Sequence, residues 1–156
     1  MSGISYTTGD ATAPADRPAV IAHVCNDLGG WGKGFVLAIS KHWPEPEAAY
    51  RKWATHGPDF ALGRSQLVKV EDDLWVANMI AQHGLRPRHG VPPIRYDALR
   101  AALDELHRLA PPGASVHMPR IGCGLAGGSW DEVGPIVEQA LAAKGRRVTV
   151  YDFARK

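Results

Sequence analysis

The feature that most constrains the fold is an almost continuous apolar run at residues 19–24 (AVIAHV). A strand with one face in water alternates apolar and polar residues, whereas a strand covered on both faces is apolar throughout. This run therefore predicts a central strand of a sheet that has helices on both sides. It leads directly into residues 26–35 (NDLGGWGKGF), where four of ten residues are glycine. The chain thus pairs a buried strand with a flexible, glycine-rich loop.

The rest of the chain alternates between strand and helix patterns. Strands are predicted at residues 4–7, 19–24, 65–70, 74–81, 115–119 and 147–153, and helices at residues 35–41, 46–55, 96–110 and 129–144. The acidic residues 71–73 between two strand patterns predict a hairpin. Ser129 and Glu132 have the spacing of a capping box at the start of the last helix. This alternation predicts one layered α/β domain over residues 1–156.

Composition excludes several other classes of protein. The apolar fraction of 45% and the charged fraction of 22% are ordinary for a globular domain, and the net charge is only +2. We see no basic stripe of a general nucleic-acid binder, no apolar run of membrane-spanning length and no signal-peptide pattern. The two cysteines and seven histidines lack metal-ligand spacing. We therefore expect a cytoplasmic monomer without membrane contact, metal or cofactor.

The strongest functional signal is the segment at residues 117–130 (HMPRIGCGLAGGSW), where a buried strand ends, glycines follow and a capped helix begins. Backbone amides at such a turn, together with the positive end of the helix, bind anions. Glycine lets a phosphate approach the backbone closely. The alternative is that these glycines only form a tight turn. Two glycine loops at the carboxyl ends of neighbouring strands, however, could hold one diphosphate between them.

Two other interpretations of the same segment are weaker. Gly122, Gly124 and Gly127 match the dinucleotide-binding fingerprint, and Asp152 lies at a suitable distance, but only one strand remains after the motif. Cys123 is a conceivable nucleophile, yet it needs a histidine base that the sequence does not place beside it. A small side chain fitted under the loop is the commoner role.

Several polar or aromatic residues elsewhere have two interpretations each. Asp10 follows the first strand and could accept a hydrogen bond from an adenine amino group, or serve as a turn residue. Asn26 and Asp27 begin the first glycine-rich loop and share that ambiguity. His83 follows a buried strand at the mouth of a loop and is a candidate for chemistry or for a solvent-facing structural role. Trp31 lies between two glycines, which indicates either a core residue or an exposed ring covering a ligand.

Together these segments resemble the macrodomain family, in particular the branch with terminal ADP-ribose protein glycohydrolase and the antitoxin that reverses DNA ADP-ribosylation. The resemblance spans nearly the whole chain and is carried by Gly9-Asp10, residues 22–26 (AHVCN), Gly32-x-Gly34 and residues 118–125 (MPRIGCGL). It implies a three-layer α/β/α fold with a mixed, largely parallel sheet and an ADP-ribose cleft at its carboxyl end. The residues that it implies for ligand binding are Asp10, Ala11, Gly32, Lys33, Gly34, Phe35, Gly84, Pro119, Ile121, Gly122, Cys123, Gly124, Leu125, Ala126 and Gly127.

The chain departs from this branch at two positions. The branch's glycohydrolases use a lysine at the end of the strand before the polar loop and an aspartate directly after GCGL. The matching residues here are Gln82 and Ala126. The lysine–aspartate mechanism is therefore not available, and either the protein is a reader or it hydrolyses by another arrangement. For that second case the candidates for orienting a water molecule are Asn26, Gln82 and His83.

The function that we expect is hydrolysis of ADP-ribose from a modified macromolecule. The bond is an ester to glutamate or aspartate of a protein, or a linkage to a DNA base. The partners are accordingly ADP-ribose and ADP-ribosylated protein, with ADP-ribosylated DNA as a further option. Two alternatives stay open: a non-catalytic ADP-ribose reader and a phosphatase acting on ADP-ribose 1″-phosphate.

Overall fold

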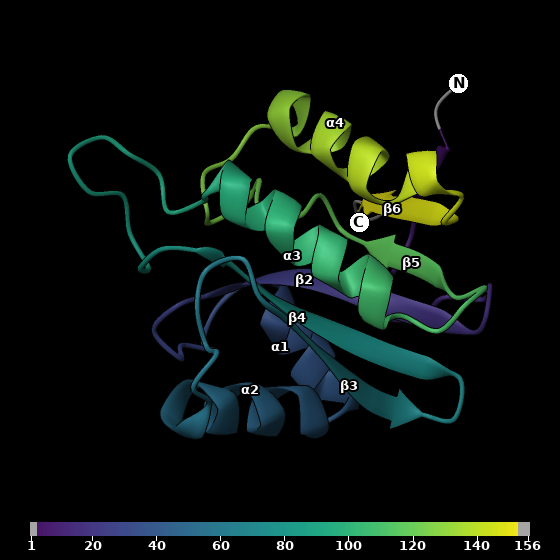
Figure 1. The fold of residues 1–156 in the computed structure, drawn as a ribbon, viewed down its shortest axis with the longest axis horizontal. Coiled ribbons are helices and arrows are strands. Elements are labelled where there is room, and N and C mark those ends of the chain that lie inside the picture. The colour runs from purple at the N-terminus through teal and green to yellow at the C-terminus, as the bar shows by residue number, and fades with distance from the viewer. Residues whose placement is uncertain (1–2, 153–156) are drawn as a thin grey trace.

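The protein, described here by a computed structural model over residues 3–152, has a six-stranded sheet between two helical layers (Figure 1). Only the β3–β4 pair is antiparallel, and the other neighbouring strands run parallel. The strands in sheet order are β1 (Ile4–Thr8), β6 (Val148–Asp152), β5 (Ser115–Met118), β2 (Ala19–Asn26), β4 (Leu74–Gln82) and β3 (Ser65–Glu71). The three-layer α/β/α fold with a mixed, largely parallel sheet is confirmed, as is the hairpin.

The helices cover both faces of the sheet. Helices α1 (Phe35–His42) and α2 (Glu45–His56) lie on one side, and α3 (Tyr96–Leu109) and α4 (Trp130–Ala140) lie on the other (Figure 1). Successive side chains of a strand point to opposite faces, so β2 contributes to two separate clusters of apolar residues. Val20 packs with the α3/α4 side and Ile21 with the α1/α2 side. This double burial explains the continuous apolar run.

The ends of some elements differ from the prediction. Strand β2 extends to Asn26, and β4 extends to Gln82, where the two strands pair across a register shift. The last helix was predicted to continue to residue 144, but α4 ends at Ala140. Leu141 leaves helical geometry with φ −122°, and a short 3₁₀ turn (η1, Ala142–Lys144) follows. Residue 153 of the predicted last strand lies outside the described residues. In residues 3–152 no helix combines the length and hydropathy needed to span a membrane.

Candidate ligand-binding cleft

A cleft of about 270 Å³ opens where the parallel strands β2, β4 and β5 end. Its walls come from the loops that follow β2 and β5, from the ends of β2 and β4, and from the start of α1. The first glycine-rich loop contributes Gly34, the second contributes Gly122 and Gly124, and the end of β4 contributes Gln82. The carboxyl edge of a parallel sheet is where α/β proteins bind ligands. The two glycine loops therefore line the same cavity, although they lie far apart in the sequence.

The side chain of Asn26 shapes the first glycine loop. Its Oδ1 accepts hydrogen bonds from the amides of Leu28 at 2.9 Å and Gly30 at 3.0 Å, and its Nδ2 donates to the Gly30 carbonyl at 2.8 Å. The hydroxyl of the fully buried Tyr50 donates to Asn26 as well, at 3.0 Å from Oδ1. The amide group of Asn26 is thus occupied by the loop itself. A side chain bonded in this way holds the backbone of the loop in place, rather than orienting a water molecule.

The second glycine loop uses its glycines in two different ways. Gly122 has φ +73°, a conformation that favours glycine, and a Cβ there would lie 2.8 Å from Cδ1 of Ile94, so that the Ile94 side chain would have to shift. Gly124 lies outside the left-handed region, and a Cβ there would meet nothing within 4 Å. Gly124 lines the cleft and is exposed. Glycine at position 124 is therefore explained by access to the backbone rather than by the turn.

The ends of β2 and β4 are joined by a carboxylate–imidazole pair. Nδ1 of His83 lies 2.6 Å from Oδ2 of Asp27, and the other oxygen of Asp27 accepts the Gly84 amide at 2.9 Å. The backbone amide of Asp27 donates to the Gln82 carbonyl at 2.9 Å. Half of the His83 side chain is exposed, whereas only 17% of the Asp27 side chain is. With Asp27 accepting from Nδ1, the Nε2 atom of His83 is left as an acceptor for a proton from water.

Arg120 is a residue of the cleft wall that the sequence analysis missed. Its guanidinium forms two hydrogen bonds to the Asp152 carboxylate, at 2.7 and 3.2 Å. The same group lies over the rings of Tyr6 and Trp130, at 5.4 and 5.3 Å from their centroids. The bond from Arg120 lowers the pKa of Asp152. Asp152 therefore serves an ion pair, which does not support the dinucleotide interpretation. The only signal in the sequence was a cation directly after a buried strand.

His23 is a second missed residue, and it lies in the floor of the cleft. Its Nε2 is 2.6 Å from Oδ1 of Asn78, and burial lowers its pKa from 6.5 to about 4. The ring of Trp31 packs edge-on against it at 5.3 Å. Trp31 is only 4% exposed and donates to Ser40 Oγ at 2.7 Å. The interpretation of Trp31 as an exposed ring over the ligand is therefore wrong, because α1 and α2 enclose it.

The cysteine in the second loop shows no sign of a nucleophile. Cys123 Sγ lies 3.4 Å from the Ile121 carbonyl, and burial raises the pKa of its thiol. A reactive thiol needs the opposite shift. The geometry favours the structural role.

Asp10 forms a local turn at the end of β1. Its Oδ1 accepts bonds from the amide of Thr12 at 2.8 Å and from the Thr12 hydroxyl at 2.6 Å. The bond from the Thr12 hydroxyl, and to a lesser extent the bond from the Thr12 amide, lowers the pKa of Asp10. Within residues 3–152 its Oδ2 forms no hydrogen bond. Asp10 is thus both a turn residue and a carboxylate with one free acceptor.

The predicted site residues fall into two groups. Those that line the cavity are Lys33, Gly34, Phe35, Gln82, Pro119, Ile121, Gly122, Gly124, Leu125 and Ala126. Those in the adjoining loops and strand ends, outside the cavity wall, are Asp10, Ala11, Asn26, Gly32, His83, Gly84, Cys123 and Gly127. The wall also contains His23, Val24, Val36 and Arg120, none of which was predicted.

Comparison with known proteins gives full-length relatives. The chain is 40% identical to the ADP-ribose glycohydrolase OARD1 of Bos taurus, over 96% of this chain and 91% of that protein. It is 54% identical to the macrodomain protein of Streptomyces coelicolor, a solved structure, with a TM-score of 0.84 over 97% and 99% of the two chains. The Mycobacterium tuberculosis DarG macrodomain is 25% identical, with a TM-score of 0.78 over 95% and 96% of the chains.

Three further relatives are either less similar in sequence or much longer than this chain. An ADP-ribose 1″-phosphate phosphatase of Lodderomyces elongisporus is 23% identical over 87% of this chain and 91% of that protein. The chromodomain-helicase-DNA-binding protein 1-like of Mus musculus is 33% identical over 99% of this chain, but the chain spans only 18% of its length. In Danio rerio the corresponding share is 16%. No family model matches the chain.

Fold and cleft define an α/β domain with a glycine-lined site at the carboxyl edge of its sheet. The relatives place it further: the chain belongs to the macrodomain family.

Proposed function

We propose that this macrodomain is an ADP-ribosyl hydrolase. Its substrate is ADP-ribose attached to a macromolecule, through an ester to glutamate or aspartate of a protein or through a linkage to a DNA base. The observation that carries the proposal is the cleft itself, in which two glycine loops face each other beside the Asp27–His83 pair. The 40% identity with a protein named as an ADP-ribose glycohydrolase supports the hydrolytic activity.

The cleft suits a diphosphate with a sugar at each end. Backbone amides of residues 124–126 and the cation of Lys33 present positive charge to the phosphates, whereas the amides of Cys123 and Gly127 already donate within the loop. The open surface at Gly124 allows the close approach that a phosphate needs. Asp10, at the end of β1 on the same edge of the sheet, offers its free Oδ2 to an adenine amino group. The distal ribose then points toward Gln82 and the end of β4.

Hydrolysis proceeds with water as the nucleophile, because Gln82 has no nucleophilic amine. A water oxygen forms a bond to the anomeric carbon of the distal ribose while the bond from that carbon to the leaving carboxylate breaks. His83 accepts the proton of the water at Nε2, and Asp27 stabilises the resulting imidazolium. Asn26 contributes by holding the first loop in shape. An acyl ester is already labile, so positioning and stabilisation of charge supply most of the rate enhancement.

The proposal is tested by measuring release of ADP-ribose from a panel of substrates that carry glutamate-linked, serine-linked or DNA-linked ADP-ribose. Binding of free ADP-ribose is measured separately by calorimetry. We expect micromolar affinity for free ADP-ribose, about −8 kcal/mol at 1 μM, and release of ADP-ribose from at least one substrate. Binding without release from any of them would identify a reader instead. Borohydride added during turnover is expected to trap no protein–ADP-ribose adduct.

The second candidate function is removal of phosphate from ADP-ribose 1″-phosphate, which the similarity to a named phosphatase favours. The same cleft would bind that substrate through the same loops. Release of inorganic phosphate from ADP-ribose 1″-phosphate, in the absence of release from any conjugate in the panel, would replace the hydrolase proposal by this one.

A further inference from the structure

A projecting arm follows β4 and extends away from the body of the domain (Figure 1). The arm comprises residues 83–93 and is closed at its base by a hydrogen bond of 2.8 Å from the His83 amide to the Pro93 carbonyl. Its tip is a tight turn at His89-Gly90, both with positive φ, flanked by two backbone hydrogen bonds between Arg88 and Val91. Such a turn fits a two-residue hairpin. The arm is therefore a defined hairpin-like structure.

The arm is attached to both glycine loops at the mouth of the cleft. On one side Cδ2 of Leu85 lies 3.4 Å from the position that a Cβ would take on Gly30 of the first loop. On the other side Cβ of Pro92 lies 2.8 Å from the corresponding position on Gly127 of the second loop. Directly after the arm, the Ile94 amide donates to the Ala126 carbonyl at 3.0 Å. The arm therefore lies against both of the glycine-rich loops that contribute to the cleft.

The charge of the arm is positive and uncompensated. Arg86 and Arg88 are exposed, and within residues 3–152 neither forms an ion pair. The sequence has no acidic residue between Asp73 and Asp97. Several other arginines are ion-paired, as Arg120 is with Asp152 and Arg147 with Asp16, although Arg100 on α3 forms no ion pair within residues 3–152 either. Two free guanidinium groups beside a binding cleft, in a chain of net charge +2, indicate an anionic partner.

The arm and the adjoining loops also expose large apolar side chains. Leu85 is 54% exposed and Val91 is 51% exposed, while Leu28 and Leu125 of the two glycine loops are each 65% exposed. These four are half of the large hydrophobic side chains exposed in residues 3–152. Exposed apolar side chains on an arm that also carries unpaired cations are typical of a surface that a partner covers.

We propose that the arm docks the polypeptide that carries the ADP-ribose and selects acidic segments containing apolar residues. This inference rests on the proposed function and names its substrate class. Arg86 and Arg88 pair with carboxylates flanking the modified side chain, and Leu85, Val91 and Leu125 contact its apolar neighbours. Residues 83–93 contain no Phe, Tyr or Trp. Surfaces for single-stranded nucleic acid combine cations with aromatic rings for base stacking, so this composition favours a polypeptide.

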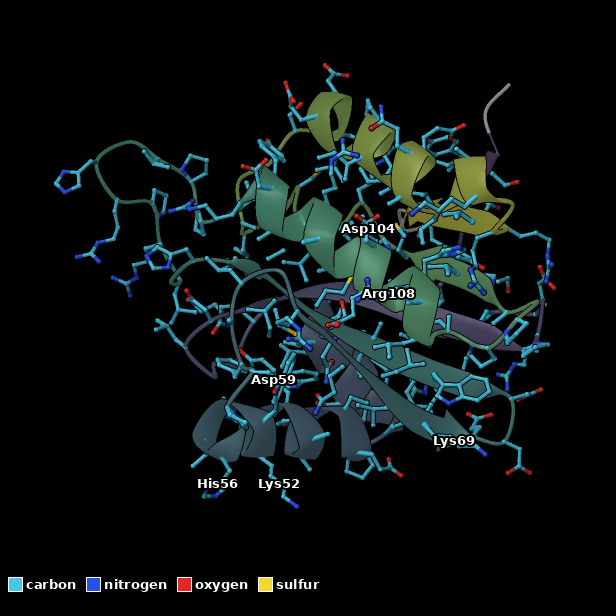
Figure 2. The ribbon with its side chains drawn as sticks, in the orientation of Figure 1. Lys52, His56, Asp59, Lys69, Asp104 and Arg108 are labelled. Carbon is cyan, nitrogen blue, oxygen red and sulfur yellow. The ribbon has the colours of Figure 1, made fainter. Side chains whose placement is uncertain are left out.

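The test compares the affinity of three ligands for the whole chain by calorimetry, so that hydrolysis plays no part. The ligands are free ADP-ribose, ADP-ribose joined by a stable amide to a peptide of aspartate and leucine, and the same conjugate with asparagine and serine. The test variant is Arg86→Ser/Arg88→Ser. The matched control, Lys52→Ser/Arg100→Ser, removes two cations from elsewhere. Lys52 points into solvent from the outer side of α2 (Figure 2), and Arg100 is exposed on α3.

We expect the acidic conjugate to bind about tenfold more tightly than the neutral conjugate at low salt, an advantage that falls as salt screens the charges. The Arg86→Ser/Arg88→Ser variant loses this advantage and keeps its affinity for free ADP-ribose within about twofold, while the control behaves as the wild type. Equal affinity for the two conjugates overturns the inference. The inference is also overturned if an ADP-ribosylated oligonucleotide gains more affinity over free ADP-ribose than the acidic conjugate does, and if that gain depends on Arg86 and Arg88. Failure to bind free ADP-ribose at all instead refutes the proposed function.

Discussion

The buried histidine in the cleft floor predicts a specific dependence of stability on pH. His23 is neutral in the folded protein, because burial lowers its pKa to about 4, and it regains the usual value of 6.5 when the chain unfolds. Between pH 6.5 and 4 the unfolded chain therefore binds one more proton at this site than the folded chain does. The contribution of neutral His23 to the free energy of unfolding is complete above pH 6.5 and is lost progressively as the pH falls toward 4.

The two pKa values set the size of the effect. Their difference corresponds to about 3 kcal/mol over the whole window, of which about 2 kcal/mol is lost between pH 7.5 and 5. Against a typical domain stability of about 5–15 kcal/mol, this loss is easily measured. His117 and His107, whose pKa values burial also lowers, contribute in the same direction.

The measurement is urea unfolding of the wild type and His23→Gln at several pH values between 7.5 and 5. Glutamine keeps an amide that can bond Asn78 but cannot titrate. The other histidines are common to both proteins, so the difference in slope isolates His23. We expect the stability of the variant to fall by about 2 kcal/mol less over this range. Parallel pH profiles would show that His23 is charged in the folded state or solvated, and would refute the argument from burial.

Three further predictions concern the cleft. Gly124→Glu is expected to fold, because a Cβ there meets nothing within 4 Å. The variant is expected to lose ADP-ribose binding, because its carboxylate repels the diphosphate. Unchanged affinity in calorimetry would show that the ligand binds elsewhere. Asp10→Asn retains an oxygen for the Thr12 bonds but presents a donor to the adenine amino group in place of the acceptor Oδ2. The affinity for ADP-ribose is therefore expected to fall about tenfold more than the affinity for ribose phosphate. Equal losses for the two ligands would show that Asp10 has only a structural role. His83→Ala is expected to lower the rate of ADP-ribose release about 100-fold with little change in its Kd, and undiminished turnover would remove His83 from the mechanism.

Local patterns in the sequence predicted the elements of this fold well. The apolar run at residues 19–24 predicted a strand covered on both faces. In β2, Val20 packs in the apolar cluster on one face of the sheet and Ile21 in the cluster on the other. Amphipathic spacing predicted α3 to within one residue, and Ser129 caps α4 through the Asp131 amide. The predicted capping box with Glu132 is not formed, because the Ser129 amide donates to the Tyr96 hydroxyl instead. These features depend on residues within a few positions of one another, so periodicity and turn chemistry suffice to find them.

The same local reasoning failed where contacts between distant segments decide whether a residue is buried or where an element ends. Trp31 between two glycines was compatible with an exposed ring, and only the way in which α1 and α2 close over β2 places it in the core. His23 was hidden within an apolar run, and its position in the floor of the cleft depends on which strands flank β2. Nothing in residues 140–144 indicated that the last helix ends before Leu141, whose side chain is fully buried.

For the site, the sequence by itself determined the chemical parts: two glycine-rich loops after buried strands, a polar strand end at Gln82 and His83, and an acid at Asp10. Tertiary structure alone decided their arrangement. The Asp27–His83 pair joins residues 56 positions apart, and the Arg120–Asp152 pair joins residues 32 positions apart. Strands that are parallel neighbours must be separated by a crossover, so the groups at their carboxyl ends come from distant segments. No local pattern encodes that proximity, and the order of strands in the sheet creates it.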